Sequence, residues 1–366
     1  MNIADLISLM GLAQGLILGV VILFSHRKWR PTLLLGLFIL TLSVRILPFL
    51  LTRSDFGDFH LETKWVPLYF WYTSLPLLYL YTLQLTDGFR WRRDWWHLLP
   101  GAVEIILFTG LYVADITSSG ELFAPVVGRR IFVLYILFSA IPSAGYGFLI
   151  FRHLNRTRDA LLNYYSDLTG KDLRWLKVFV VYLFAFGSAY LFMRFGPVRI
   201  ERQTVVLFGA VANTLGIYYI TIHGIRQVTI RRPRPDPVPE NPPEREVESA
   251  EPAADHSALF AQVEAYMRKS QCYLKPQLTI ADLSTALQVS ERTLSRAING
   301  GGQQHFNGYV NRYRIEHAKR LLRDERYDRF NLEGIAVESG FNNKATFYRA
   351  FKIHSATSPA VYRRTR

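Results

Sequence analysis

Two clusters of basic and hydroxyl-bearing residues near the C-terminal end have the composition of a surface that reads DNA. Arginine can donate two hydrogen bonds to guanine O6 and N7, while serine and threonine contact thymine methyl groups or phosphates. In each cluster these residues alternate with apolar residues at helical spacing, so each cluster would lie on one face of a short helix. The first cluster is Arg292, Thr293, Ser295 and Arg296, and the second is Asn343, Lys344, Thr346, Tyr348 and Arg349.

The elements that must position the first cluster are two short helices with a tight connection. Thr279, with Asp282 three residues later, has the pattern of a capping box in which Asp replaces the usual Glu or Gln. Ser290 offers the N-cap of the second helix, where Leu294 and Ile298 are one turn apart and face a core. The pattern predicts a helix-turn-helix unit.

The second cluster lies in a similar arrangement. Asn331 is a candidate N-cap, Gly340 supplies the turn, and Phe341 fills the core. Phe347 and Phe351 form an apolar pair four residues apart on the second helix. The chain therefore carries a second helix-turn-helix unit.

A long amphipathic helix is predicted between the two units, over residues 306–325. We interpret its basic residues as surface charges or phosphate contacts; they are Arg312, Arg314, Lys319 and Arg320. Its predicted buried face includes Phe306, Tyr309, Val310, Tyr313, Ile315, Ala318, Leu321 and Leu322.

At these residues the chain resembles the AraC/XylS family of bacterial transcription regulators, over about residues 262–364. The strings that carry the resemblance are VNRYRIEHAKRLL, IAVESGFNNKATFYRAFK and TSPAVYR. The family implies two helix-turn-helix units, joined by the long helix, that enter successive major grooves of DNA. Two residues depart from its pattern, because Ser284 stands where Ala is usual and Ala356 where Gly is common.

The resemblance also assigns roles to individual residues. The starts of the two leading helices, at Thr279 and Asn331, are suited to phosphate contact. Base contacts from the first unit are implied for Arg292, Ser295 and Arg296. Base contacts from the second unit are implied for Lys344, Thr346, Tyr348 and Arg349.

Charge and hydropathy divide the chain of 366 residues, whose net charge is +14, into three parts. Residues 1–232 carry +10, the proline-rich and acidic residues 233–256 carry −5, and residues 257–366 carry +9. Phosphates attract the positive charge of the last part. Cys272 is the one cysteine, which excludes an intramolecular disulfide framework. We expect a membrane domain (1–225), a linker (226–256) and a DNA-binding domain (257–366).

Seven apolar runs of membrane length occur in the first part. Each has about 20 residues, enough to cross ~30 Å of hydrocarbon as a helix. The expected fold is therefore all-α, with a bundle of seven transmembrane helices followed by the two helix-turn-helix units. The runs are 3–24, 33–51, 66–85, 95–113, 131–151, 175–195 and 205–222.

Basic loop residues predict the orientation of this bundle. If the N-terminus is outside, the cytoplasmic loops hold most of the Lys and Arg residues, which fits the positive-inside rule. The DNA-binding domain is then cytoplasmic, and the bilayer is a bacterial inner membrane. The expected partners are promoter DNA, lipid, RNA polymerase and a second copy of the chain, together with an unidentified signal.

Two ionisable residues fall inside the apolar runs at similar depth, Arg45 and Glu104. Buried charges in a bilayer usually face the bundle interior and pair, so we expect an intramembrane ion pair, with a functional or a purely structural role. Residues 153–177 form the longest cytoplasmic loop. Its aromatic and basic residues suit an interfacial helix, or a contact that restrains or positions the DNA-binding domain.

Other functions fit the sequence less well. A transporter or channel with a regulatory domain would show internal repeats, and we find none. An enzyme would need a motif such as HExxH, GxSxG or a P-loop, and none occurs; no cofactor or metal site is expected either. Proteolytic release at the linker would modify the leading hypothesis, a membrane-anchored transcription regulator.

Overall fold

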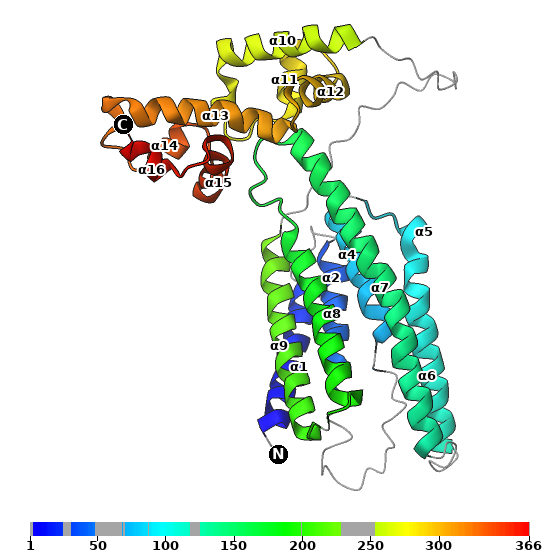
Figure 1. Cartoon of the computed structure of the whole chain (residues 1–366). Helices are drawn as coiled ribbons and strands as arrows, with labels where there is room; N and C mark the ends of the chain where they lie inside the picture. The colour runs from blue at the N-terminus through cyan, green and yellow to red at the C-terminus, as the bar shows by residue number, and fades with distance from the viewer. Residues whose placement is uncertain are drawn as a thin grey trace, which may run out of the picture. The chain divides into compact units, whose positions relative to one another are not determined.

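The computed structural model describes residues 3–24, 31–47, 68, 70–86, 88–117, 125–198, 200–227 and 253–365. These residues are mainly helical (Figure 1). Tyr165 and Thr279 form an isolated antiparallel bridge. The predicted all-α fold is confirmed for them. Most of the predicted linker, residues 228–252, lies outside the described residues.

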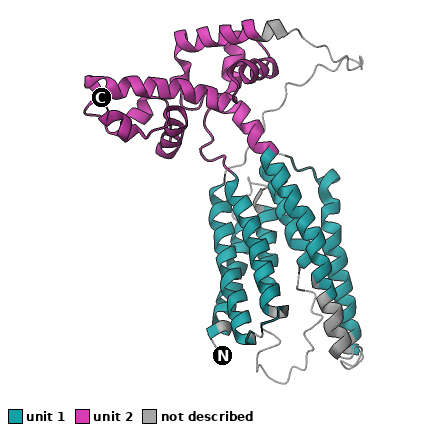
Figure 2. Cartoon of the chain, viewed as in Figure 1, with its two compact units in different colours: residues 1–155, 173–231 teal, residues 156–172, 232–366 magenta. Residues whose placement is uncertain are grey.

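The chain forms two compact units whose boundaries differ from those predicted (Figure 2). Residues 156–172 group with the C-terminal unit, and residues 1–155 and 173–231 form the other one. The helices of the first unit are α1 (Ile3–Phe24), α2 (Pro31–Val44), α4 (Trp71–Leu85), α5 (Trp91–Asp94), α6 (Leu99–Thr117), α7 (Pro125–Tyr164), α8 (Arg174–Phe195) and α9 (Arg202–Arg226). The last part of α7 belongs to the C-terminal unit.

Each of the seven predicted apolar runs overlaps one of these helices. Within the described residues, four helical stretches are long and apolar enough to cross a membrane: Asp5–Phe24, Trp91–Ala114, Arg174–Met193 and Gln203–Arg226. Leu33–Val44 is apolar but shorter. The spans expected at α2, α4 and α7 stay predictions.

Small residues allow α1 and α2 to approach closely. A Cβ atom added to Gly36 would lie 3.1 Å from the carbonyl oxygen of Gly19 and closer still to Leu23. Close backbone contact at small residues is the usual way in which helices associate in lipid. The first unit continues from this pair, because α9 packs against α1 and α8, α2 packs against α4, and α4 packs against α6.

The C-terminal unit contains two hydrophobic cores joined by one helix, α13 (Phe306–Arg323). The first core is enclosed by α10 (Ala253–Ser270), α11 (Ile280–Leu287), α12 (Glu291–Gly302) and the N-terminal half of α13. The second is enclosed by the C-terminal half of α13 with α14 (Leu332–Glu338), α15 (Lys344–Ser355) and α16 (Pro359–Arg364). The two predicted helix-turn-helix pairs are thus α11–α12 and α14–α15.

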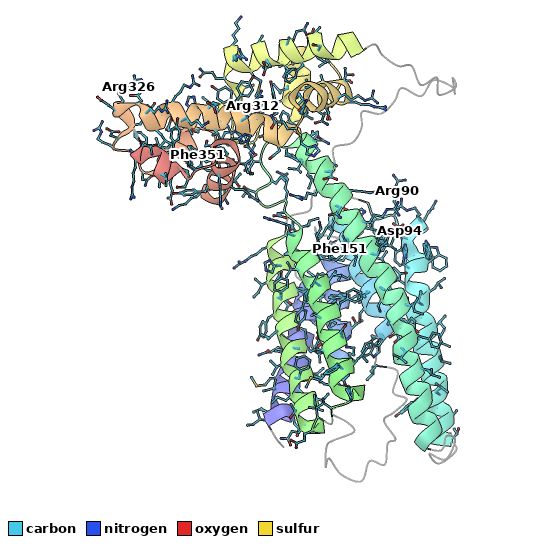
Figure 3. All side chains as sticks on the ribbon, viewed as in Figure 1. Arg90, Asp94, Phe151, Arg312, Arg326 and Phe351 are labelled. Carbon is cyan, nitrogen blue, oxygen red and sulfur yellow. The ribbon has the colours of Figure 1, made fainter. Side chains whose placement is uncertain are left out.

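Aromatic rings fill the second core as the spacing predicts. Phe347 and Phe351 are both fully buried on α15, with ring centroids 5.7 Å apart in an edge-to-face arrangement. Figure 3 labels Phe351. Phe341 packs against Phe347 at 5.3 Å and is 2% exposed. Such edge-to-face pairs add stability beyond the burial of their surface. The hydrophobic pattern is sufficient to orient α15.

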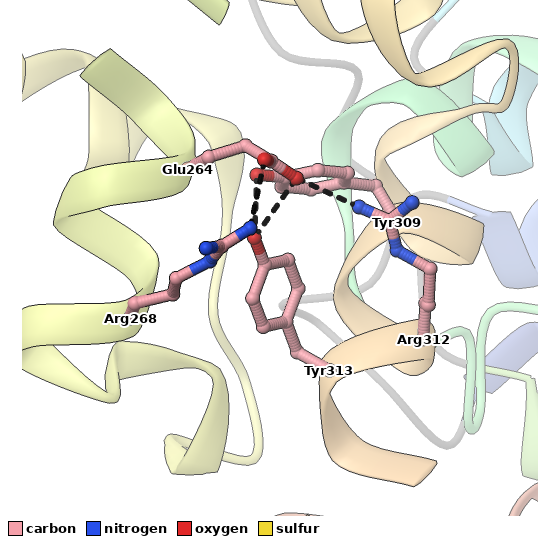
Figure 4. Close-up of polar contacts among 5 residues, drawn as sticks. All are labelled: Glu264, Arg268, Tyr309, Arg312 and Tyr313. Atoms are coloured by element: carbon pink, nitrogen blue, oxygen red, sulfur yellow. Dashed lines mark hydrogen bonds and ion pairs between the residues drawn. The ribbon is translucent and has the colours of Figure 1, made fainter. Parts of the chain in front are cut away.

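A polar cluster ties α10 to the linking helix α13 (Figure 4). The Glu264 carboxylate accepts hydrogen bonds from Arg268 (3.1 Å) on its own helix and from Arg312 (3.0 Å) and Tyr313 (3.2 Å) on α13. The Arg312 guanidinium also lies over the Tyr309 ring, 5.4 Å from its centroid. The cluster fixes α10 beside the first helix-turn-helix unit.

Ala356 ends α15 in the left-handed conformation, with φ of 54°. An L-residue with a Cβ atom is strained there, and glycine is not. Ala356→Gly is therefore expected to stabilise the C-terminal unit by about 1 kcal/mol. Urea-dependent proteolysis of the full-length protein measures the change. An unchanged or lower midpoint would show that the strain is relieved elsewhere.

Candidate nucleic-acid interface

Helix α12 presents the first predicted cluster on its solvent side. Ser290 caps the helix by accepting a hydrogen bond from the Thr293 amide, at 3.1 Å. Leu294 and Ile298 are fully buried, which leaves Arg292 and Arg296 exposed on the other face. Thr293 and Ser295 are half-buried. The arginines are therefore free of the core and available to a groove.

Helix α15 presents the second cluster in a similar way. Lys344 and Arg349 are exposed, and Thr346 and Tyr348 are half-buried. Asn343 is the N-cap, since its Oδ1 accepts hydrogen bonds from the amides of Ala345 (2.7 Å) and Thr346 (3.4 Å). Its side chain thus supports the helix that carries the other members of the cluster.

Lys344 has a partner within the unit that competes with DNA. Its Nζ lies 2.6 Å from Oε1 of Glu333 on α14, and this hydrogen bond raises the pKa of the lysine. Both side chains are more than half exposed, so the pair is weak in water. A phosphate or a base edge can replace Glu333 as the partner of Lys344.

The two predicted phosphate-contact residues serve as helix caps. Thr279 forms the predicted capping box with Asp282: the Thr279 hydroxyl accepts from the Asp282 amide (3.2 Å), and the Asp282 carboxylate accepts from the Thr279 amide (2.8 Å). The Asn331 Oδ1 accepts from the Gly334 amide at 2.7 Å. Phosphate contact at these helix starts stays a prediction.

One of the basic residues predicted on the surface of α13 is buried. Arg314 is 1% exposed, so its interpretation as a surface charge or phosphate contact is wrong. Its guanidinium donates to the carbonyl oxygens of Tyr273 (2.7 Å), Lys275 (2.8 Å) and Pro276 (3.2 Å). Burial lowers its pKa to about 10, opposed by the nearby Asp167, so it stays protonated at neutral pH. A buried arginine and an exposed one look alike in the sequence of an amphipathic helix, so the burial of Arg314 could not be predicted.

The departure from the family pattern at Ser284 has a local explanation. The Ser284 hydroxyl donates to the carbonyl oxygen of Val289, at the end of the turn between α11 and α12. The Val289 amide in turn donates to the Ser284 carbonyl oxygen at 3.2 Å. The substitution strengthens the turn that sets the direction of α12.

The expected Arg45–Glu104 ion pair is not formed, although both residues lie beside Trp71. Glu104 accepts hydrogen bonds from the amides of Trp71 (2.7 Å) and Tyr72 (3.1 Å) and from the hydroxyls of Thr73 and Tyr135. The Arg45 guanidinium lies 5.3 Å from the centroid of the Trp71 ring. The positive end of the α4 dipole therefore stabilises the Glu104 carboxylate. This is the carboxylate that we expected to pair with Arg45.

The exposed faces of α12 and α15, held by α13, define a DNA-binding domain of the helix-turn-helix class. A family described as helix-turn-helix domain matches residues 283–365. Over 112 residues the chain is 32% identical to the uncharacterized HTH-type transcriptional regulator YijO of Escherichia coli (strain K12). This match covers 31% of the chain and 38% of that protein.

Two further similarities fall on a comparable length of chain. An uncharacterized HTH-type transcriptional regulator of Staphylococcus aureus (strain MSSA476) is 34% identical over 96 residues, which are 25% of this chain and 12% of that protein. A solved protein of unknown function from Listeria innocua is 29% identical, with a TM-score of 0.26, over 29% of this chain and 96% of that chain. The chain thus spans less than half the length of these two curated regulators. Its C-terminal part carries an AraC-type helix-turn-helix domain similar to theirs.

Two half-buried histidines make the stability of the C-terminal unit depend on pH. Burial, together with neighbouring basic residues, lowers the pKa values of His317 and His354. The unfolded chain binds these protons near pH 6.5, so it holds more protons than the native state below that pH. We expect stability to be full well above pH 6.5 and to fall as the pH drops below that value. Urea-dependent proteolysis at several pH values measures this, and His317→Gln with His354→Gln should flatten the profile. A slope that persists in the double variant would assign the effect to other groups.

Proposed function

We propose that the protein is a membrane-anchored bacterial transcription regulator that binds promoter DNA sequence-specifically through its two helix-turn-helix units. The observation that carries the proposal concerns α12 and α15, which pack against the same helix, α13. Each is capped at its N-terminus and buries one face, and each exposes its arginines to solvent. Short recognition helices of this kind enter the major groove with their N-terminal residues near base edges. The second copy of the chain, RNA polymerase and the signal are further partners in this proposal.

The apolar helices of the first unit support the membrane part of the proposal. Four stretches reach spanning length, and many of their apolar side chains are exposed, as lipid contact requires. The orientation proposed from the basic loops places the N-terminus outside and the DNA-binding domain in the cytoplasm. Reporter fusions at both ends of the chain test the orientation, and resistance to alkaline extraction of membranes tests the anchoring.

Mapping the chromosomal sites bound by the full-length protein in living cells tests the regulator function. Wild-type protein should occupy discrete promoter sites, and the Arg296→Ala, Arg349→Ala double variant should lose them. Arg326→Ala removes an exposed arginine next to Asp324, away from α12 and α15, and should leave the sites occupied. Identical maps for the wild-type protein and the double variant would contradict the proposal.

A cavity in the first unit supports a sensing role. It measures about 210 Å³ and is lined mainly by apolar and small residues, with Asp5 and Arg45 as its charged residues. No hydrogen bond or ion pair joins the Arg45 guanidinium to another described residue. A guanidinium beside an apolar space suits a small ligand with an apolar body and an acidic group.

We expect octanoate to stabilise the full-length protein against thermal unfolding, because its carboxylate can pair with Arg45 while its chain fills the cavity. The measurement is the shift in melting temperature in detergent micelles, with octanol as the uncharged control. Arg45→Gln should abolish the difference between acid and alcohol, and Arg45→Lys should retain part of it. Equal shifts for both compounds in wild-type protein would remove the cavity from the sensing role.

A further inference from the structure

The two helix-turn-helix units meet at a polar joint around the middle of α13. Arg314 lies between the part of α13 that enters the first core and the part that enters the second. It donates to the carbonyl oxygens of Tyr273, Lys275 and Pro276, which precede α11. From the other side Gly340, with φ of 81°, lies so close that an added Cβ would be 2.9 Å from the Tyr273 carbonyl oxygen. The joint therefore contacts elements of both helix-turn-helix units.

A segment far away in the sequence, residues 163–169, is inserted into this joint. Ser166 is fully buried; its amide donates to the Leu278 carbonyl oxygen (3.1 Å), and its hydroxyl accepts from Arg314 (3.1 Å). Next to it, Tyr165 and Thr279 form the antiparallel bridge that places the segment against the start of α11. These contacts attach the segment to the first helix-turn-helix unit.

The same segment is bonded to the linking helix. Asn307, in the first turn of α13, donates its side-chain amide to the carbonyl oxygens of Ser166 (2.7 Å) and Tyr165 (3.3 Å). The Asn163 side chain meets the ring of His305, the N-cap residue of α13, at 2.9 Å. The segment thus lies along the first turn of α13, the helix that leads into the joint.

The C-terminal end of this segment contacts the second helix-turn-helix unit. Asp167 is 8% exposed, and its Oδ2 accepts a hydrogen bond from the side chain of Asn342 at 3.1 Å. Asn342 immediately precedes the N-cap of α15, the second recognition helix. The other oxygen of Asp167 accepts from the amide (3.0 Å) and hydroxyl (2.7 Å) of Thr169, which holds the carboxylate in place.

We call the base pairs that one recognition helix contacts a box. We propose that residues 163–169 dock between the two helix-turn-helix units, fix their relative orientation, and thereby set the affinity for DNA that carries both boxes. The proposal rests on the proposed function. The docked segment contacts the joint, while Arg292, Arg296, Lys344 and Arg349 stay exposed, so docking positions the recognition helices and does not mask them. Along the chain, α7 leads into the segment and α8 follows it.

A fixed orientation of the two helix-turn-helix units raises the affinity only for DNA sites that carry two boxes. Two recognition helices bind boxes about 34–36 Å apart at once only when their orientation matches that spacing. A fixed joint makes the second contact nearly intramolecular, whereas a loose joint loses part of that advantage. A site with a single box uses one helix and gains nothing from the joint.

The test compares two duplexes with full-length protein in detergent micelles. The first is a duplex that wild-type protein selects from a random 30-base-pair library, and the second has the α15 box scrambled. Asp167→Ala should weaken binding to the first duplex about tenfold, the effect of losing one hydrogen bond to a charged group. It should change binding to the second by less than about twofold, the usual margin for independent sites.

Two comparisons separate docking from general damage. Asp159→Ala removes an exposed acid of α7 that lies just before the segment, and it should behave as wild type. Asn342→Ala should repeat most of the effect of Asp167→Ala, and the double variant should be no worse than Asp167→Ala alone, because both substitutions remove the bond between Asp167 and Asn342. Equal losses on both duplexes would mean that the segment only supports the fold, and would overturn the proposal.

A disulfide lock tests the direction of the effect. Residues opposite one another in an antiparallel bridge have Cα atoms ~4.5–5.5 Å apart, within the span of a disulfide. Tyr165→Cys and Thr279→Cys are combined with Asp167→Ala and Cys272→Ser, and the same protein is measured oxidised and reduced. Oxidation should strengthen binding to the two-box duplex about fivefold, half or more of the loss that Asp167→Ala causes.

Each outcome has a consequence. Weaker binding in the oxidised form, or no difference, would overturn the docking proposal while the proposed function stands. If wild-type protein selects no duplex at all, the proposed function fails and the docking proposal fails with it.

Discussion

Arg296→Ala and Arg349→Ala are each expected to lower the affinity for the selected DNA by about 1–3 kcal/mol, and each should relax specificity at a different box. Both guanidiniums are exposed on the solvent faces of the recognition helices, and each can donate two parallel hydrogen bonds to a guanine. Because α12 and α15 belong to separate helix-turn-helix units, each substitution should reduce discrimination at different base pairs.

Binding measurements on a panel of single-base variants of the duplex show which base pairs lose discrimination. Arg326→Ala is the matched control, because this arginine is exposed and pairs with Asp324 outside both recognition helices. The control should change affinity only slightly and specificity not at all. If Arg296→Ala and Arg349→Ala weaken binding to every duplex equally, these arginines contact phosphate and do not read bases.

Arg314→Met is expected to destabilise the C-terminal unit by about 3 kcal/mol, although methionine fits much of the same volume. The substitution leaves the carbonyl oxygens of residues 273, 275 and 276 and the hydroxyl of Ser166 without their buried donor. Unsatisfied buried acceptors carry the full penalty of lost hydration. Arg314→Lys should recover only part of the loss, because one ammonium group cannot replace the guanidinium fork.

Urea-dependent proteolysis of the full-length protein measures this loss through the cleavage of the C-terminal unit. Arg312→Met is the matched control, two residues away on α13: its side chain is 41% exposed, and its ion pair with Glu264 is worth at most about 1 kcal/mol. Comparable midpoints for the Arg314→Met and Arg312→Met variants would show that water replaces the guanidinium in the joint.

Local patterns were sufficient to predict the elements of the C-terminal unit. The capping box at Thr279, the N-caps at Ser290 and Asn331 and the buried pair Phe347–Phe351 all follow from residues within one or two turns of each other. Their determinants are short-range, since an N-cap needs only the amides of the next turn. The same locality explains why α11, α12, α14 and α15 lie where the sequence places them.

The joint could not be predicted for the opposite reason. Its partners are distant along the chain: Ser166 and Arg314 are 148 residues apart, and Asp167 and Asn342 are 175 apart. A lone aspartate in a polar loop and an arginine on an amphipathic helix carry no local sign of burial. The predicted boundary at residue 257 missed the segment for this reason, and charge and hydropathy alone assigned it to a membrane loop.

The intramembrane pair shows a similar limit. Two lone charges at equal depth favour pairing, but a helix start offers a carboxylate an alternative that composition does not reveal. Glu104 takes this alternative at the amides of Trp71 and Tyr72. Arg45 lies beside a cavity, and the proposed function therefore assigns it the binding of an acidic ligand.

Hydroxyl-radical footprinting of the full-length protein on the selected duplex tests most directly that two helix-turn-helix units read one DNA site. We expect two protected patches on one face of the duplex, about one helical turn apart. Arg296→Ala should remove one patch and Arg349→Ala the other. A single protected patch, or a footprint that neither substitution changes, would contradict the account.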